Sequence, residues 1–278
     1  MPTVGKMRAE QLIRQATKST ERLRILLAGE STTGKTTSFK TLPTALRNVG
    51  VENPRIVVAD FDQNGDELMD DPAFEVYRFG GIPGSDPEAF GAARYWMDNV
   101  ASKMEGVHAF ISDSITALSL TSLAAVAKDN NRLGSAPQLQ DWNHEMHATQ
   151  QWCLDMQNLK VSHAVITTVH THLEKDDLSG RAYNRLVLTG KLPEKLVRLF
   201  PEIYYAHVVS KLNSPNQYNW RLVPDAQTKA RTMISGLRGD NGVVTQDFAP
   251  MFKAWFAGRK EAEEVEVNKT LAEGNSHE

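Results

Sequence analysis

Gly29-Glu30-Ser31-Thr32-Thr33-Gly34-Lys35-Thr36 is the stretch that decides the fold, because it matches the pattern G-x-x-x-x-G-K-[ST] at every fixed position. The apolar run Leu23 to Ala28 precedes it and predicts a buried strand. A helix is expected over residues 36–42, ended by Pro43. Strand, glycine-rich loop and helix in this order predict a P-loop, whose backbone N–H groups surround phosphate at the positive end of a helix dipole.

Each position of this loop has an expected task. Lys35 would reach the β- and γ-phosphates of ATP, and the Thr36 hydroxyl would hold Mg²⁺. The alternative is a glycine-rich turn without a ligand, against which the fixed positions and the strand–helix frame argue together. ATP and Mg²⁺ are the predicted cofactors. The predicted nucleotide-binding residues are Gly29, Glu30, Ser31, Thr32, Thr33, Gly34, Lys35, Thr36 and Thr37.

Apolar runs alternate with helical patterns along the rest of the chain, which is typical of β-α-β units and a parallel sheet. Further on, two strand-like runs flank the turn residues 213–216 and predict a hairpin. We therefore expect an α/β fold with a twisted, mainly parallel sheet flanked by helices and an antiparallel C-terminal edge. The expected strands are 55–59, 74–79, 107–112, 162–169, 203–210 and 218–223, and the expected helices are 87–104, 115–128 and 142–160.

Composition places the chain among globular proteins, with 41% hydrophobic and 23% charged residues. The net charge of −3 equals that of residues 259–278, which hold three basic and six acidic residues. We expect an N-terminal helix over residues 1–20 that could serve as an oligomerisation arm, a core over 21–257 and a disordered acidic tail over 258–278. The single cysteine, the absence of a secretory signal and the lack of a long apolar stretch predict a cytoplasmic protein outside the membrane.

Carboxylates follow two of the expected strands. Asp113 comes directly after VHAFIS and is expected to hold Mg²⁺ with Thr36; the alternative is that it caps the helix starting at Ile115. Asp60 and Asp62 follow RIVVA, and alternation would place both on one face. One of them would polarise the attacking water as general base, and the other would be structural.

His170 ends the fourth expected strand, where its side chain could contact the γ-phosphate. A packed or solvent-facing histidine is the alternative, and His172 is a rival for the same role.

The motifs GESTTGKTT, VADFD, FISDSITAL, VITTVHTH and TKARTM, spread over Leu23 to Met233, together resemble the RecA-like recombinase core. The resemblance is greatest to phage-encoded RecA-like ATPases of single-strand annealing and recombination. It implies a RecA-like P-loop fold and an ATPase stimulated by DNA. It also implies that Asp62, where recombinases usually carry Glu, activates water. In place of the usual glutamine sensor of the γ-phosphate the alignment offers Thr168, Val169 or His170, of which we choose His170. Lys229 and Arg231 would reach into the ATP site of a neighbouring subunit.

The same resemblance implies two DNA-binding loops, at about residues 128–140 and 171–191. The second loop carries basic residues beside an aromatic one, which suits single-stranded DNA; a solvated loop is the alternative. The implied partners are single-stranded DNA, further copies of the chain in a ring or filament, and a single-stranded-DNA-binding protein. A small-molecule kinase and an ATP-switched assembly protein with little turnover are the competing functions. The predicted DNA-binding residues are Lys175, Arg181, Tyr183, Arg185 and Lys191.

Overall fold

The computed structural model of the chain describes residues 22–176, 180–238 and 241–257. Residues Arg22–Ala254 form one compact unit, and the fold below is that of this unit. The expected N-terminal arm, residues 1–20, and the expected acidic tail, residues 258–278, lie outside the described residues.

The centre of the unit is a parallel sheet. Its strands run side by side in the order β3-β2-β4-β5-β1-β7, and every neighbouring pair in this series is parallel. Three of these strands, β1, β2 and β4, are almost wholly buried, as their continuous apolar sequences predict. The strands are β1 (Leu23–Gly29), β2 (Ile56–Asp60), β3 (Phe74–Arg78), β4 (Val107–Asp113), β5 (Val161–Lys175) and β7 (Glu202–Val209).

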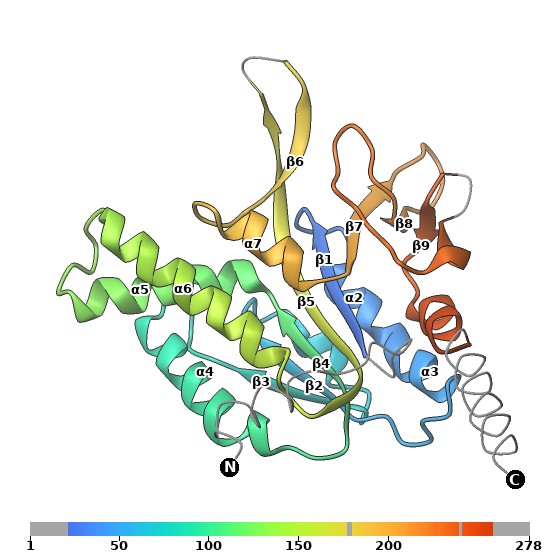
Figure 1. Cartoon of the computed structure of the whole chain (residues 1–278), viewed down its shortest axis with the longest axis horizontal. Coiled ribbons are helices and arrows are strands. Elements are labelled where there is room, and N and C mark those ends of the chain that lie inside the picture. The colour runs from blue at the N-terminus through green and yellow to red at the C-terminus, as the bar shows by residue number, and fades with distance from the viewer. Residues whose placement is uncertain (1–21, 177–179, 239–240, 258–278) are drawn as a thin grey trace, which may run out of the picture. The chain divides into compact units, whose positions relative to one another are not determined.

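Antiparallel strands extend this sheet at the C-terminal end of the chain. β8 (Gln217–Arg221) returns along β7, and β9 (Val243–Thr245) pairs with β8. A further strand, β6 (Ala182–Leu186), pairs with the end of β5 as a hairpin that projects from the sheet (Figure 1). The predicted α/β architecture, a mainly parallel sheet flanked by helices with an antiparallel C-terminal edge, is confirmed.

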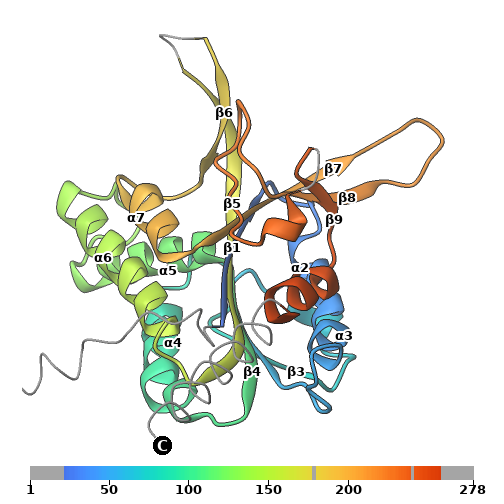
Figure 2. The ribbon, with the colours of Figure 1, turned by 45° about the vertical axis from the view of Figure 1, so that its right-hand side comes forward.

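Helices cover both faces of the sheet (Figure 2). One face carries α4 (Pro87–Asn99), α5 (Ile115–Asp129), α6 (Leu139–Met156) and α7 (Leu192–Leu199), and the other carries α2 (Lys35–Ser38) and α3 (Leu42–Arg47). Short 3₁₀ turns lie at η1 (Phe39–Thr41), η2 (Gly65–Leu68), η3 (Ala101–Lys103) and η4 (Ser235–Leu237). No helix in the described parts of the chain is both long enough and apolar enough to cross a membrane.

Aromatic side chains fill the space between the sheet and each helical layer. Under α4 and α6, Phe61 stacks on Phe79 and meets the edge of Trp152. On the other side, Phe248 packs against Phe39 and Trp220. All of these rings are at least 92% buried, so they hold the helices that flank the strand ends.

Two expectations of the sequence are wrong in detail. Pro43 does not end the helix after the P-loop, because α3 begins at Leu42 and accepts proline in its first turn, where no N–H is needed. The fourth long strand does not end at Val169: β5 continues to Lys175 because β6 supplies it with a pairing partner. The loop expected at 128–140 is confirmed, since α5 ends at Asp129 and α6 begins at Leu139.

Candidate nucleotide-binding site

The P-loop joins the end of β1 to the start of α2, as predicted. Gly34 has a φ of 81°, a conformation that glycine adopts without steric cost. A Cβ at Gly29 would lie 2.8 Å from the carbonyl oxygen of Ala206, so the adjacent strand leaves no room for a side chain there. The Thr33 hydroxyl donates to the carbonyl of Glu30 at 2.7 Å and closes the loop. The loop is thus a tight backbone cradle of the kind that binds phosphate.

Lys35 lies within this cradle. Its side chain is 6% exposed, and Nζ donates to the carbonyls of Gly29 at 3.0 Å and Glu30 at 2.7 Å. Burial lowers the pKa of Lys35, while the nearby carboxylates, Asp113 foremost, oppose this shift. The two carbonyl partners hold this buried ammonium group in position at the loop.

Asp113 ends β4 and faces the first turn of α2. Its Oδ2 accepts from the Thr36 hydroxyl at 2.6 Å, and its Oδ1 accepts from the Thr168 hydroxyl. Burial raises the pKa of Asp113 to about 6, although the two threonine hydrogen bonds lower it. Thr36 and Asp113 together offer hard oxygen ligands of the kind that Mg²⁺ prefers. Asp113 does not cap α5, which was the alternative role for it. The cap is Ser114, whose Oγ accepts from the amide of Ala117 at 3.2 Å.

Asp60 and Asp62 have separate sets of partners. Asp60 is fully buried and accepts from Arg78 Nε at 3.1 Å and from the amide of Gly65 at 2.9 Å. Asp62 accepts from the Ser114 hydroxyl at 2.9 Å and lies 3.0 Å from Nε2 of His170. Because β2 ends at Asp60, strand alternation does not reach Asp62. Asp60 therefore closes the loop after β2, and Asp62 faces the ends of β4 and β5.

His170 joins Asp62 to the P-loop. Its Nε2 contacts Oδ2 of Asp62, and its Nδ1 lies 3.5 Å from Oγ of Ser31. The register of the sheet explains this position, because His170 pairs with Gly29 across the end of β1. The rival His172 is 53% exposed on the β5–β6 hairpin, where it lies 3.7 Å from Glu174. The carboxyl ends of β1, β2 and β4, and the point where β5 passes the end of β1, thus bring the P-loop, Asp62, Asp113 and His170 together.

Comparison with protein families matches residues 21–235 to the family described as AAA domain. The chain belongs to the AAA domain family. An AAA domain with an intact P-loop is a nucleotide-binding ATPase. Curated proteins include no detectable sequence relative.

Two solved structures are similar to this AAA domain. A KaiC-like protein from the hyperthermophilic archaeon Pyrococcus horikoshii OT3 is 13% identical, with a TM-score of 0.42 over 80% of this chain and 88% of that chain. An ATPase from the type III secretion system of pathogenic bacteria is 15% identical, with a TM-score of 0.39 over 70% of this chain and 59% of that chain.

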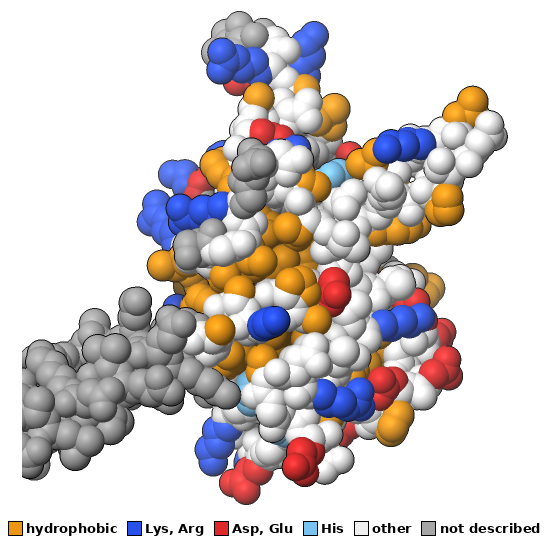
Figure 3. Space-filling model, turned by 90° about the vertical axis from the view of Figure 1, so that its right-hand side faces the viewer, with side chains coloured by type: hydrophobic (Ala, Val, Ile, Leu, Met, Phe, Trp, Pro, Cys, Tyr) orange, Lys and Arg blue, Asp and Glu red, His pale blue; other side chains and the backbone are white. Residues whose placement is uncertain are grey.

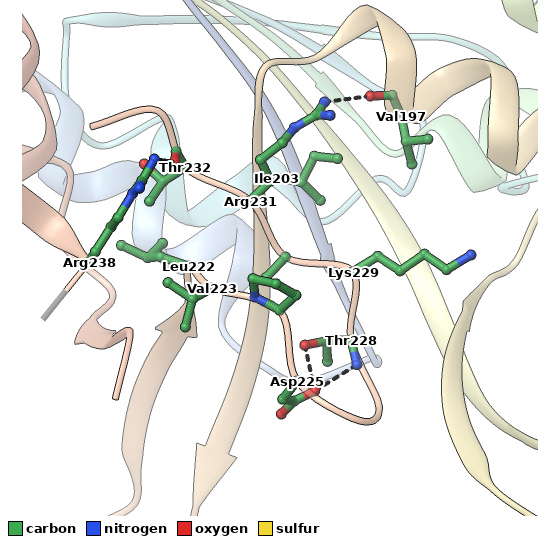
Figure 4. Close-up of a pocket in the computed structure, with 12 residues that line it drawn as sticks. Val197, Ile203, Leu222, Val223, Asp225, Thr228, Lys229, Arg231, Thr232 and Arg238 are labelled. Carbon is green, nitrogen blue, oxygen red and sulfur yellow. Dashed lines mark hydrogen bonds between the residues drawn. The ribbon is translucent and has the colours of Figure 1, made fainter. Parts of the chain in front are cut away.

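The basic pair Lys229 and Arg231 lies away from this constellation in the AAA domain. The segment that carries the pair meets β7 through a single antiparallel bridge between Ile203 and Arg231. Both residues line a cavity of about 620 Å³, in which Lys229 is exposed and extends outward (Figure 4). Arg231 instead donates to the carbonyls of Val197 at 2.8 Å, Phe200 at 2.5 Å and Pro201 at 3.1 Å. Within its own chain, Arg231 therefore satisfies carbonyls at the end of α7.

The predicted DNA-binding residues are distributed over the β5–β6 hairpin and the start of α7. Pairing places Tyr183 opposite Glu174, and Arg185 forms an ion pair with Glu174 at 3.0 Å. Lys175 lies opposite Ala182 and is exposed near the end of the hairpin, as is Arg181. Lysine and arginine side chains gather at this end (Figure 3). Lys191 stands apart from the hairpin, at the N-cap of α7.

Three residues of the site carried no assigned role in the sequence. Thr168 and Ser114 sit beside predicted residues, and the signal that could have found them is the hydroxyl next to each strand end. Gln246 donates from its side-chain amide to the carbonyl of Thr33 in the P-loop at 2.8 Å. Its contact with the loop spans 213 positions, and no local pattern marks it.

Proposed function

We propose that this chain hydrolyses ATP and acts on single-stranded DNA as an oligomer, in recombination, annealing or repair in the cytoplasm. The observation that carries the hydrolytic part is the convergence of Lys35, Asp113, Asp62 and His170 at the carboxyl ends of adjacent strands. The single-stranded-DNA part rests on the projecting hairpin and on the sequence resemblance to phage-encoded annealing ATPases. A single-stranded-DNA-binding protein is the further partner that this role suggests.

The residues divide the chemistry among them. Lys35 and the loop N–H groups hold the β- and γ-phosphates, and Thr36 and Asp113 would hold Mg²⁺. Bound Mg²⁺ supplies positive charge that offsets the charge on the phosphates. A water oxygen attacks the γ-phosphorus, the bond to the β–γ bridging oxygen breaks, and ADP leaves with that oxygen. Asp62 accepts the proton that the water loses, while Ser114 and His170 keep its carboxylate in place.

We also propose that His170 senses the γ-phosphate. Its imidazole lies between the Ser31 side chain of the P-loop and the candidate base Asp62. Its backbone oxygen accepts from the amide of Val187 at 2.8 Å, at the foot of the β5–β6 hairpin. We therefore propose that His170 connects the phosphate site to the β5–β6 hairpin, which would bind DNA.

The shared active site is the part of the proposal that concerns Lys229. Its side chain is exposed and extends outward from the cavity, so its ammonium group is free to approach the ATP site of a neighbouring subunit as a transition-state cation. Lys229→Ala should lower turnover about tenfold without changing ATP affinity, and mixing this variant with Lys35→Ala should restore activity. Arg231→Ala is the matched comparison and should lower the melting temperature, because it removes three carbonyl contacts. Specific activity that stays constant down to a monomeric concentration would exclude a shared site.

ATP hydrolysis measured with and without single-stranded DNA, over a series of salt concentrations, tests the proposal as a whole. We expect single-stranded DNA to stimulate turnover, and the stimulation to fall as salt rises, because phosphate contacts release counterions. Turnover without any association with oligonucleotides at low salt would favour a small-molecule kinase. DNA binding without turnover would favour an ATP-switched assembly protein.

A further inference from the structure

The wall behind the P-loop is built by a segment near the other end of the described chain. Gln246 directly follows β9, and its side chain is 8% exposed. Its Nε2 donates to the Thr33 carbonyl at 2.8 Å and to the Asn219 carbonyl at 3.2 Å. One amide group therefore joins the P-loop to the antiparallel strands.

The Thr33 carbonyl matters because of the peptide group to which it belongs. Thr33 C=O and Gly34 N–H share one planar unit, and in a trans peptide they point in opposite directions. A P-loop binds phosphate with N–H groups directed inward, so its carbonyls face the surrounding protein and need donors there. A donor that fixes the Thr33 oxygen on the outside also fixes the direction of the Gly34 N–H on the inside.

Further contacts hold the same region. A Cβ at Gly34 would lie 2.8 Å from Oε1 of Gln246 and 2.8 Å from the Tyr218 ring, so both side chains lie close against this glycine. Two residues on, the amide of Phe248 donates to the Thr41 hydroxyl at 3.0 Å, and its ring stacks on Phe39. The segment 246–248 therefore touches both the P-loop and the helical turns that follow it.

We propose that Gln246 is a positioning residue for nucleotide binding, which orients the Thr33–Gly34 peptide so that its N–H faces the phosphates. Gln246 acts through the backbone of the loop and does not itself touch the nucleotide. The proposal concerns nucleotide affinity alone, so it holds or fails independently of any action on DNA.

Gln246→Leu tests this role, because leucine keeps most of the volume and removes the amide donor. The dissociation constant for ADP, measured by titration of the full chain well below its melting temperature, should rise about tenfold as the buried Thr33 carbonyl loses its partner. The value of kcat at saturating ATP should change much less than KM. Gln217→Leu is the matched control: it makes the same change at an exposed position on β8 and should leave ADP affinity unaltered.

A structural role without positioning would lower the melting temperature of Gln246→Leu and leave ADP affinity within twofold, and this result would overturn the proposal. Hydrogen–deuterium exchange of the unaltered protein gives a second test that does not depend on the variant folding. Adding ADP should slow exchange in a peptide covering residues 243–248 together with one covering the P-loop. Protection of the P-loop with no change in residues 243–248 would also overturn it.

Discussion

The P-loop site and the β5–β6 hairpin both carry charged side chains, but they hold them in opposite ways. In the site, Lys35 and Asp113 are 6% and 2% exposed, and their partners come from the P-loop, α2 and β5. On the hairpin, Lys175 and Arg181 are exposed, and Arg185 pairs with Glu174 on the adjacent strand. A change in the site leaves a buried group without its partner, whereas water and salt screen each charge on the hairpin. The site should therefore respond sharply to single substitutions, and the hairpin gradually to several.

Lys35→Ala should give the largest effect. The variant lacks a charge-assisted hydrogen bond to phosphate, which contributes about 1.5–3 kcal/mol to binding, and this change should abolish nucleotide-dependent activity while the fold remains. ATP turnover and circular dichroism measure the two quantities. Lys40→Ala, which changes an exposed lysine a few residues further on, is the control and should retain activity. Turnover equal to that of the unaltered protein in Lys35→Ala would contradict the P-loop assignment.

The second-largest effect should distinguish the roles of Asp60 and Asp62. Asp62→Asn should lower kcat about 100-fold or more and leave ATP affinity unchanged, because the general base is removed and the phosphate-binding groups remain. Asp60→Asn should instead lower the free energy of unfolding by about 1–3 kcal/mol, because a buried acceptor of Arg78 and Gly65 is weakened. Turnover and urea unfolding of both variants are the measurements. If Asp60→Asn stopped turnover and Asp62→Asn did not, the roles would be exchanged.

Asp113 links the site to pH. Burial raises its pKa from 3.8 to about 6, so the folded state binds this proton more tightly than the unfolded state. The contribution of Asp113 to the free energy of unfolding is fully present below its pKa in the unfolded state. It is lost as pH rises through its pKa in the folded state, by about 3 kcal/mol in all.

Without Mg²⁺ and nucleotide, Asp113→Asn should therefore be more stable than the unaltered protein above pH 6, and similar to it near pH 4. With Mg²⁺, the same variant should lose activity. Urea unfolding between pH 4 and pH 7 measures the free energy of unfolding of the Asp113→Asn variant and of the unaltered protein. Asp70→Asn, which changes an exposed aspartate, is the control. Parallel stability curves over this range would contradict it.

The hairpin should give the smallest effect. Arg181→Ala combined with Arg185→Ala should weaken binding of single-stranded DNA about threefold to tenfold at low salt. The slope of log K against log salt should become less steep by about 0.7 for each phosphate that the variant no longer neutralises. Lys211→Ala, on the β7–β8 hairpin, is the control in an exposed position. Fluorescence anisotropy with a labelled oligonucleotide measures affinity and slope, and equal slopes for all three proteins would remove the hairpin from the DNA site.

Local patterns were enough to predict the frame of the site. Residues 29–36 predict the P-loop because its glycines, lysine and threonine are all neighbours in the sequence and form one loop. Asp113 was predicted from the end of its strand, since parallel strands end at one edge of the sheet. His170 lies at the same edge because it pairs with Gly29 at the end of β1, although β5 continues to Lys175. The DNA-binding residues were also chosen from local composition, and their role stays a prediction.

Only the tertiary structure decided which residues meet across the chain. Asp60 and Asp62 look equivalent in VADFD, and they differ because Arg78 and the amide of Gly65 bind one, while Ser114 and His170 bind the other. Lys229 and Arg231 in TKARTM differ because Arg231 donates hydrogen bonds to carbonyls at the end of α7, whereas Lys229 is exposed. Gln246 reaches Thr33 because β9 pairs with β8 beside the P-loop. Such contacts depend on the register and order of strands, and a sequence pattern that repeats over a few residues carries no information about either.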